Sequence, residues 1–309
     1  MGAMAYIYEK TYFEDDLRSI NDSKLSIAGS AVLYGLSVYT VFPVIVNEKH
    51  EKLAFRLQDH FERLINSASI IGIDTFSKNW NYNQFLKAVK QIIAANDIKE
   101  TVFARATVHI DELLPGTKSR GLKSILSIFL YEAVPILPQD GARLKTSVWR
   151  RIPDYAIPSR AKVNGAYVNS VLAKQDAIDS GYDDCVFLDA SGHVCELSAA
   201  NIFIVRDNTL ITPDTTNDLL EGINRKTVLE LAKELGIKVV ERDIDLTELY
   251  IADEVFACGT SAYIAPITEI DAREVNNKKI GPITTKLKNK YAEIFAQKSP
   301  NHQKLFTKL

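Results

Sequence analysis

Residues 183–213 read DDCVFLDASGHVCELSAANIFIVRDNTLITP, and this stretch limits the fold more than any other part of the chain. Its apolar runs bracket the short segments ASGH and RDNT, whose Gly, Asn, Asp and Ser residues are typical of tight turns. Because turns this short join antiparallel strands, the stretch predicts an antiparallel meander. A purely helical fold is therefore excluded.

Helices accompany the predicted sheet. In residues 52–73 the side chains of Leu57, Phe61, Leu64, Ile65 and Ala68 recur at helical spacing, and residues 82–97 repeat the pattern. Strands are expected at 102–111, 123–134, 238–244 and 254–259, and helices at 224–236, closed by Gly236, and from about Ile283. The fold class is therefore α/β.

A linker divides the chain into two halves. The stretch VPILPQDGARLK, residues 134–145, has two prolines, a glycine and polar residues between strand-like runs. We place the linker at about 136–147, an N-terminal α/β domain at 1–135 and a C-terminal domain at 136–309. With 309 residues, of which 46% are hydrophobic, the chain is long enough for two buried cores.

The composition excludes several classes of function. The 37 basic and 39 acidic residues are interspersed, so no field attracts nucleic acid or anionic lipid. No apolar run approaches the roughly 20 residues of a membrane-spanning helix, and no membrane association is expected. The five histidines match no zinc spacing, so no metal site is expected. Three cysteines without metal-ligand spacing fit a reducing compartment, and the expected location is cytoplasmic.

The sequence carries no familiar hydrolase or nucleotide motif, but it does contain features suited to an anion. G-x-S-x-G, Walker and G-x-G-x-x-G patterns are absent. LLEGINRKTVLE places Gly222 just before a helix N-terminus, where free N–H groups favour phosphate. ACGTSAYIAP places the hydroxyls of Thr260 and Ser261 in a turn after an apolar strand, and Arg56 could supply the countercharge. Taken singly, each feature is more often an ordinary turn or surface residue.

Read in order, these segments resemble one family. RAKVNGAYVNSVLAKQDAIDSGYDD, the meander, LLEGINRKTV, ELYIADEVFACGTSAYIAPI and GPITTKL resemble the class IV (fold type IV) pyridoxal-phosphate-dependent aminotransferases, and most of all the branched-chain amino-acid aminotransferases. The likeness covers nearly all of residues 149–290, while LYGLSVY and FRLQDHFERL agree more weakly. It implies an α/β N-terminal domain, a pseudo-barrel α/β C-terminal domain, and a homodimer that holds pyridoxal 5'-phosphate between the domains.

The resemblance implies a role for individual residues at the cofactor. Lys162 matches the lysine whose primary amine forms an imine with the cofactor and shuttles a proton. Glu196 matches the glutamate that keeps the ring nitrogen protonated. Without the resemblance, both would be taken as surface side chains. The other implied contacts are Tyr167 to the phenolic oxygen, Leu220 on the ring face, and Arg56, Gly222, Ile223, Asn224 and Thr260 at the phosphate, where Asn224 replaces the family's usual threonine.

The substrate site departs from the family pattern. The residues implied there are Tyr34, Tyr39, Phe103, Arg105, Ser261 and Ala262. The family's Tyr-x-Arg motif is Phe103-Ala104-Arg105 in this chain, so the arginine is kept and the tyrosine hydroxyl is lost. Branched-chain enzymes usually read Phe-Glu-Gly-Ile-Arg where this chain reads Tyr-Thr-Val-Phe-Pro, residues 39–43. A glycine and an arginine that shape the pocket are therefore missing.

The implied reaction is ping-pong transamination between an amino acid, hydrophobic and branched-chain-like, and a 2-keto acid such as 2-oxoglutarate. Alternatives on the same fold are a D-amino-acid or (R)-amine aminotransferase and an aminodeoxychorismate-type lyase. A non-catalytic binding protein on the same scaffold is a more distant alternative. A second lysine, Lys174, lies on the flank of an amphipathic helix that bears Val168, Val171, Leu172 and Ile178, and we expect it to be a solvated or snorkelling side chain.

Overall fold

The computed structural model describes residues 5–309, which divide into two compact units. The first unit contains the described residues up to Val134, together with Ala161–Gly165 and Ser299–Leu309, and the second contains Pro135–Arg160 and Ala166–Lys298. The domain division at residue 136 stays a prediction, to which the structure adds the two segments that return to the first unit. Within residues 5–309, no helix is both long enough and apolar enough to cross a membrane.

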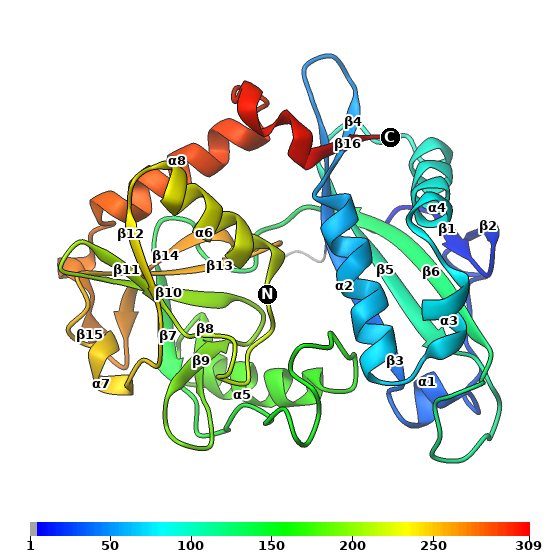
Figure 1. The fold of residues 1–309 in the computed structure, drawn as a ribbon, viewed down its shortest axis with the longest axis horizontal. Coiled ribbons are helices and arrows are strands. Elements are labelled where there is room, and N and C mark those ends of the chain that lie inside the picture. The colour runs from blue at the N-terminus through cyan, green and yellow to red at the C-terminus, as the bar shows by residue number, and fades with distance from the viewer. Residues whose placement is uncertain (1–4) are drawn as a thin grey trace. The chain divides into compact units, whose positions relative to one another are not determined.

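The first unit is built on one antiparallel sheet (Figure 1), and its strands run in the order β16-β4-β3-β5-β6-β1-β2. Their bounds are β1 Lys10–Phe13, β2 Asp16–Ser19, β3 Ser37–Val46, β4 Lys52–Phe55, β5 Val102–Ile110, β6 Ser124–Glu132 and β16 Phe306–Lys308. The strands predicted at 102–111 and 123–134 are confirmed as β5 and β6. The final strand, β16, pairs with β4 and was not predicted.

Helices accompany this sheet in the first unit, and the two longest bury an apolar face. Their bounds are α1 Ser30–Leu33, α2 Leu57–Ile70, α3 Asp74–Asn79 and α4 Tyr82–Ala95, with a 3₁₀ turn at Pro300–Leu305. The predicted helices are confirmed as α2 and α4, although residues 52–55 of the first stretch form strand β4. Helix α2 buries Leu57, Phe61 and Leu64, and Figure 1 shows it beside β3. Helix α4 starts at a capping box, in which Asn81 and Gln84 each bond the other's backbone N–H.

The second unit contains a mixed sheet that closes on itself. Its strands are β7 Ala142–Thr146, β8 Asp184–Leu188, β9 Val194–Leu197, β10 Asn201–Arg206, β11 Thr209–Thr212, β12 Lys238–Glu241, β13 Glu254–Gly259, β14 Tyr263–Ile270 and β15 Arg273–Glu274. The strand order is β12-β11-β10-β13-β14-β7-β8-β9, and β9 also pairs with β10. That extra pairing turns six strands into a barrel-like ring around a core that includes Leu144, Val186 and Ile204. The pseudo-barrel and the antiparallel meander β8–β11 are both confirmed.

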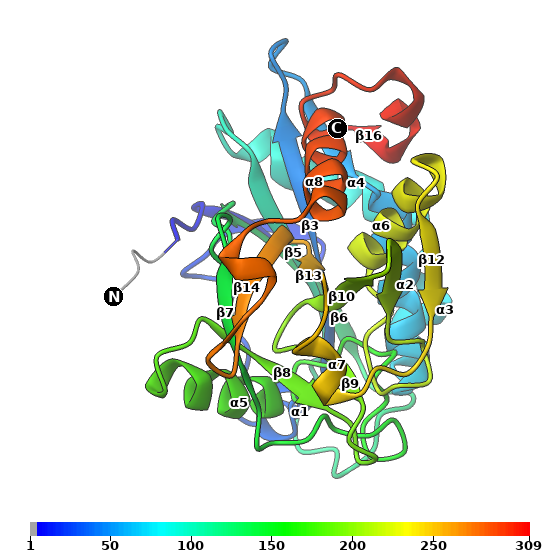
Figure 2. The same ribbon diagram turned by 90° about the vertical axis from the view of Figure 1, so that its left-hand side faces the viewer.

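Helices also cover the second sheet. Their bounds are α5 Tyr167–Asp179, α6 Ile223–Glu234, α7 Leu246–Leu249 and α8 Pro282–Phe295, with a 3₁₀ turn at Asn276–Lys278. Figures 1 and 2 show α6 beside α8, while α5 lies by β8. Gly236 follows α6 with a φ of +68°, a conformation that suits glycine, so the predicted helix end is confirmed.

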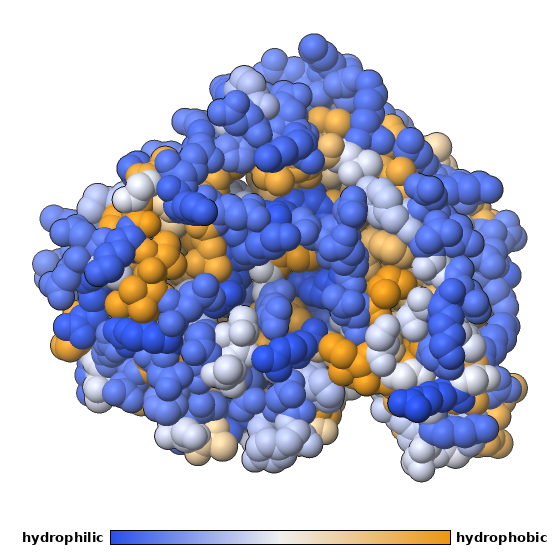
Figure 3. All heavy atoms as spheres, viewed as in Figure 1, coloured by the Kyte–Doolittle hydropathy of each residue, from blue (hydrophilic) through white to orange (hydrophobic). Residues whose placement is uncertain are grey.

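Helix α5 corrects one expectation. Its large apolar residues are exposed, with exposed fractions of 64% for Val168, 64% for Val171, 41% for Leu172 and 48% for Ile178. Small residues form the buried side, where Ala173 and Ala177 pack on Cys185, Phe187 and Cys195. By contrast, the face seen in Figure 3 is mainly hydrophilic, with hydrophobic side chains in separate groups.

Lys174 also differs from the expectation. Its amine lies 3.3 Å from a carboxylate oxygen of Asp184, whose side chain is fully buried, and 30% of the Lys174 side chain is exposed. Lys174 is therefore a partner of a buried acid and not simply a solvated side chain.

Candidate active site

Lys162 lies on a short segment that is fastened to the first unit on two sides. The backbone N–H of Tyr39 donates to the Lys162 carbonyl at 3.0 Å, and Asn164 N–H donates to the Ser37 carbonyl at 2.9 Å. On the other side, the Lys162 N–H donates to Ser67 Oγ of α2 at 3.1 Å. The backbone of Lys162 is thus fixed between β3 and α2, which limits the positions that its amine can reach.

Two glycines permit this close approach. Gly35 has a φ of +65°, and a Cβ added to it would lie 2.9 Å from the Cα of Gly165. Real Cβ atoms do not come this close to backbone, so a side chain at Gly35 would push the segment that carries Lys162 away. A Cβ added to Gly165, the glycine of AKVNGAY, would in turn lie 3.3 Å from the Gly35 carbonyl oxygen, which is closer than most real Cβ contacts, so this glycine also serves the packing.

The Lys162 side chain lies beside a tyrosine that also carries an arginine. Lys162 Nζ is 4.9 Å from the centroid of the Tyr39 ring, and Arg105 Cζ is 3.6 Å from the same centroid. Both cations are attracted by the ring's negative face. Three of the predicted site residues, Lys162, Tyr39 and Arg105, are therefore brought together in the first unit.

A buried polar cluster that sequence reasoning missed lies on the same strand. Thr40 Oγ1 is 2.7 Å from His60 Nδ1 and accepts a hydrogen bond from Arg63 Nη2 at 3.0 Å. Burial, and after it the charges of Arg63, Arg56 and Lys162, hold the pKa of His60 well below its usual value of 6.5. His60 is therefore neutral at pH 7. The buried helix face of α2 was predicted, but nothing in the sequence assigned this histidine to Thr40.

Arg56 stands at the N-cap of α2 in a left-handed conformation, with a φ of 49°. Its side chain is only 4% exposed, and its Nε donates to Asp59 at 2.6 Å. Its backbone N–H donates to the Leu305 carbonyl at 2.6 Å, so the returning end of the chain fixes this residue. A buried guanidinium at this place suits an anion, and its contact with phosphate stays a prediction.

Glu196 is a buried carboxylate of the second unit. It lies on β9, is 6% exposed, and its Oε1 is 3.0 Å from Arg151 Nη2. Its Oε2 accepts hydrogen bonds at 3.3 Å from Asn201 Nδ2 and from the Leu220 N–H. Asn201 in turn donates to the Leu220 carbonyl at 2.9 Å. The structure thus brings Glu196 and Leu220 together, while Arg151 and Asn201 are partners that the sequence reading missed.

The N-terminus of α6 has the features of an anion site. Gly222 is its N-cap, and no side chain caps the helix there. A Cβ added to Gly222 would lie 2.1 Å from Asn201 Oδ1, so a side chain here would displace the Asn201 amide from its hydrogen bonds to Glu196 and Leu220. Ile223 and Asn224 form the first turn, and Asn224 Oδ1 accepts a hydrogen bond from Tyr291 at 3.0 Å. The backbone N–H groups of this turn therefore remain the donors suited to phosphate.

The turn between β13 and β14 holds the remaining predicted residues of the second unit. The Ser261 carbonyl accepts from the Ile136 N–H at 2.9 Å, and the Ala262 carbonyl accepts from Gln139 Nε2 at 3.1 Å. Ala262 is fully buried, and Thr260 and Ser261 are half-buried. The predicted linker segment therefore braces this turn.

The positions of three other predicted residues do not indicate a specific role. Tyr167 is the first residue of α5 and is half-buried. Tyr34 follows α1 and is 46% exposed. Phe103 is fully buried on β5, with its ring centroid 5.7 Å from that of Tyr131. Their roles stay predictions.

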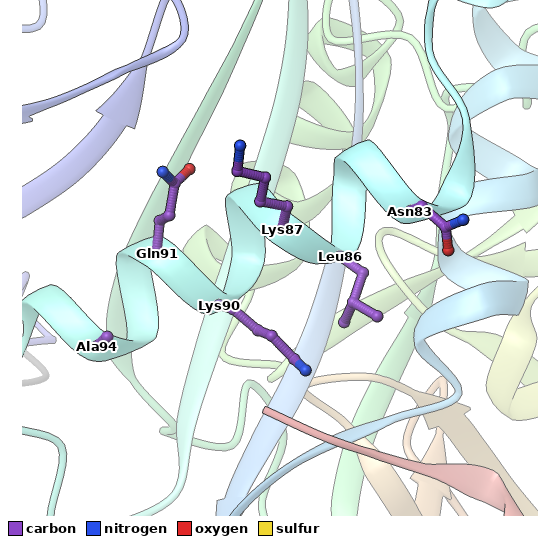
Figure 4. Close-up of a pocket in the computed structure, with 6 residues that line it drawn as sticks. All are labelled: Asn83, Leu86, Lys87, Lys90, Gln91 and Ala94. Atoms are coloured by element: carbon purple, nitrogen blue, oxygen red, sulfur yellow. The ribbon is translucent and has the colours of Figure 1, made fainter.

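The hollow along α4 and the three cysteines do not form functional sites. A hollow of about 430 Å³ runs along α4 and is lined by Asn83, Leu86, Lys87, Lys90, Gln91 and Ala94. All six residues come from one helix, and Figure 4 shows Lys87 and Lys90 pointing in different directions, so they do not converge on a ligand. The three cysteines are buried, and burial raises the pKa of the Cys258 thiol to about 12, so this thiol is not reactive at pH 7.

Comparisons with known proteins find a matching family and relatives that are similar over most of the chain. A family model described as amino-transferase class IV matches residues 37–270. The probable branched-chain-amino-acid aminotransferase of Aquifex aeolicus is 37% identical over 299 residues, which cover 96% of this chain and 95% of that protein.

Solved structures of branched-chain aminotransferases are also similar to this chain. The branched-chain aminotransferase of Thermoproteus uzoniensis with norvaline has a TM-score of 0.92 at 34% identity, covering 97% of this chain and 99% of that chain. The branched-chain amino acid aminotransferase of Thermobaculum terrenum in its PLP-form (holo-form) has a TM-score of 0.90 at 30% identity, covering 98% of this chain and 98% of that chain.

Proposed function

The chain belongs to the class IV aminotransferases, and from this premise we propose that it moves the amino group of a hydrophobic, branched-chain-like amino acid to a 2-keto acid such as 2-oxoglutarate. The observation that carries the proposal is the family match over residues 37–270, which includes every predicted cofactor residue from Arg56 to Thr260. The cofactor of the family is pyridoxal phosphate, and the Thermobaculum terrenum relative was solved in its form with that cofactor.

The residues present fit this cofactor. The uncapped start of α6 and the glycine cradle at Gly222 suit its phosphate, and the buried Glu196 suits a protonated ring nitrogen. When bound, pyridoxal phosphate supplies an aldehyde that takes up the donor's amino group and a ring that withdraws electrons from the donor Cα.

Each side chain then has a defined task. With the cofactor bound, the Lys162 amine would be the base that takes the proton from the donor Cα and delivers it to the cofactor C4′. Its anchored backbone supports this role, because proton transfer needs the base within hydrogen-bond reach. Glu196 holds the proton on the ring nitrogen, and its contacts with Arg151, Asn201 and Leu220 restrict the orientation of its carboxylate. The residues assigned to substrate carboxylate are Arg105 in the first unit and, separately, Ser261 and Ala262 in the second.

The substrate preference tests the proposal directly. With Val41, Phe42 and Pro43 in place of the family's Gly-Ile-Arg, the pocket loses a cation and a flexible residue. We therefore expect weaker activity on leucine, isoleucine and valine than a typical family member has, or a preference for another hydrophobic or aromatic donor. A panel of L- and D-amino donors with 2-oxoglutarate measures this. Efficient turnover of all three branched-chain donors, with little activity on others, would reject the altered pocket.

The same panel separates the alternatives. Activity on D-donors or (R)-amines alone would replace the L-amino-acid assignment. Release of pyruvate without any keto-acid acceptor would indicate a lyase. A purified protein that binds pyridoxal phosphate but changes its absorption with no donor would be a binding protein, and the proposed function would be wrong.

We further propose that the protein is a cytoplasmic homodimer. The large apolar side chains that α5 exposes support an interface, since exposed apolar patches commonly mark association surfaces. Buried, free cysteines fit a reducing compartment. The variant Val171→Glu is expected to shift sedimentation from dimer toward monomer, whereas Gln91→Glu on the exposed face of α4 is not. A monomeric wild-type protein would contradict the dimer.

A further inference from the structure

Arg105 is held by an asparagine from the Lys162 segment. Its Nη2 donates to Asn164 Oδ1 at 2.6 Å, while the guanidinium lies on the Tyr39 ring. Among the described residues this is the hydrogen bond that the structure gives Arg105, and the guanidinium has further N–H groups that can donate to a ligand. Because a guanidinium presents its donors as a planar fork, its rotation about the ring decides where they point.

Asn164 is itself fixed at its other end. Its Nδ2 donates to Ser37 Oγ at 2.6 Å, and its backbone N–H donates to the Ser37 carbonyl at 2.9 Å. Since arginine can only donate, the amide oxygen must face Arg105 and the amide nitrogen must face Ser37. The Asn164 side chain thus has one orientation that satisfies both partners. The two hydrogen bonds that link Ser37, Asn164 and Arg105 therefore fix the guanidinium relative to β3.

The positively charged side chains beside the Tyr39 ring are Arg105 and Lys162. Burial, and after it the charge of Arg105, lowers the pKa of His109 to about 4, so this histidine of β5 is neutral at pH 7. Arg105 and Lys162 both lie on the Tyr39 ring, so the predicted anion-binding group and the predicted base share one support. Asn164 follows Lys162 by two residues in the chain.

We propose that Asn164 is a positioning residue, which aligns Arg105 so that its remaining N–H donors meet a substrate carboxylate. This inference rests on the proposed function, and it adds a residue that acts on substrate binding without touching the reacting atoms. Loss of Asn164 should therefore raise the KM for the keto acid and leave kcat nearly unchanged.

A double-mutant cycle tests the proposal. Asn164→Ala is expected to raise the KM for 2-oxoglutarate by about tenfold, the loss expected when one hydrogen bond to a charged group disappears. Arg105→Ala should raise KM at least as much. The double variant should be no worse than Arg105→Ala alone, because Asn164 acts on substrate only through Arg105. Asn47→Ala, in the β3–β4 turn where that side chain bonds Glu51, is the matched control and should change nothing.

Two further variants keep the test decisive if Asn164→Ala folds poorly. Ser37→Ala removes only the far anchor and should give a smaller rise in KM. Asn164→Asp keeps an acceptor for Arg105 but adds a negative charge that competes with substrate, so it should weaken keto-acid binding although Arg105 stays in place. Calorimetric titration of the inert dicarboxylate glutarate should show the same order of affinities without turnover.

The outcomes distinguish a failure of the positioning role of Asn164 from a failure of the proposed function. Additive effects of Asn164→Ala and Arg105→Ala on KM, or a loss confined to kcat in Asn164→Ala, would overturn the positioning role. A wild-type protein without transamination activity would instead overturn the proposed function.

Discussion

Replacing Lys162 with alanine is expected to lower the transamination rate by about 10²–10⁴-fold, the contribution of one positioned acid–base group. The fold should survive, because the hydrogen bonds that join Lys162 to Ser67 and Tyr39 use its backbone. The phosphate site on Gly222 and Asn224 would be untouched, so the variant should still bind some pyridoxal phosphate. Steady-state rates, with cofactor content measured by absorption, provide the test.

Lys174→Ala is the control for this prediction. It should keep turnover, but its melting temperature should fall because the buried Asp184 loses its ion pair. Lys174→Arg should restore much of that stability. An active Lys162→Ala variant, or an inactive Lys174→Ala variant that folds normally, would show that the motif assignment is wrong.

Glu196→Gln is the second change with a large expected effect. A neighbouring carboxylate shifts the pKa of its partner by about 1–3 units, so a neutral amide should lower the protonated fraction of the ring nitrogen, and with it the rate, by about 10–10³-fold. Glutamine keeps an oxygen that can accept from Asn201 and from the Leu220 N–H, so cofactor binding should persist.

The pairing with Arg151 requires its own control, because the glutamine variant would leave that guanidinium without the carboxylate that now lies at 3.0 Å. Glu196→Asp keeps the charge and should retain much more activity than Glu196→Gln. If Glu196→Gln turns over at the wild-type rate, Glu196 serves structure and not catalysis.

The meander of residues 183–213 could be predicted because local signals agreed with the tertiary fold. Turn-forming residues separated apolar runs, and each run became a strand of the closed sheet. The last strand, β16, could not be found in this way. It is three residues long, and Phe306 pairs with Phe55 near the other end of the chain, a contact without any local pattern.

Helix α5 shows why periodicity alone can mislead. Its apolar residues repeat at helical spacing, yet the residues that pack on the sheet are alanines, which let the helix lie close to Phe187. A hydrophobic pattern identifies a face that avoids water, but it does not say whether that face meets the chain's own core.

The roles of Lys162 and Glu196 were inferred from the order and spacing of the motifs that resemble the family, and they stay predictions. The supporting residues Asn164, Arg151, Asn201 and His60 were missed, since each acts through a contact with an element distant in sequence. One signal was available: Asn164 is polar within AKVNGAY, a run of small and apolar residues next to Lys162, and a polar residue in such a run needs a partner.

The central claim is that the Lys162 amine holds the cofactor, and chemical fixation tests it most directly. The wild-type protein loaded with pyridoxal phosphate would be reduced with borohydride, digested, and mapped by mass spectrometry. The account predicts that the phosphopyridoxyl mass appears on the peptide containing Lys162 and disappears when an amino donor is added first. Stable labelling of Lys174 or another lysine, with Lys162 unmodified, would contradict it.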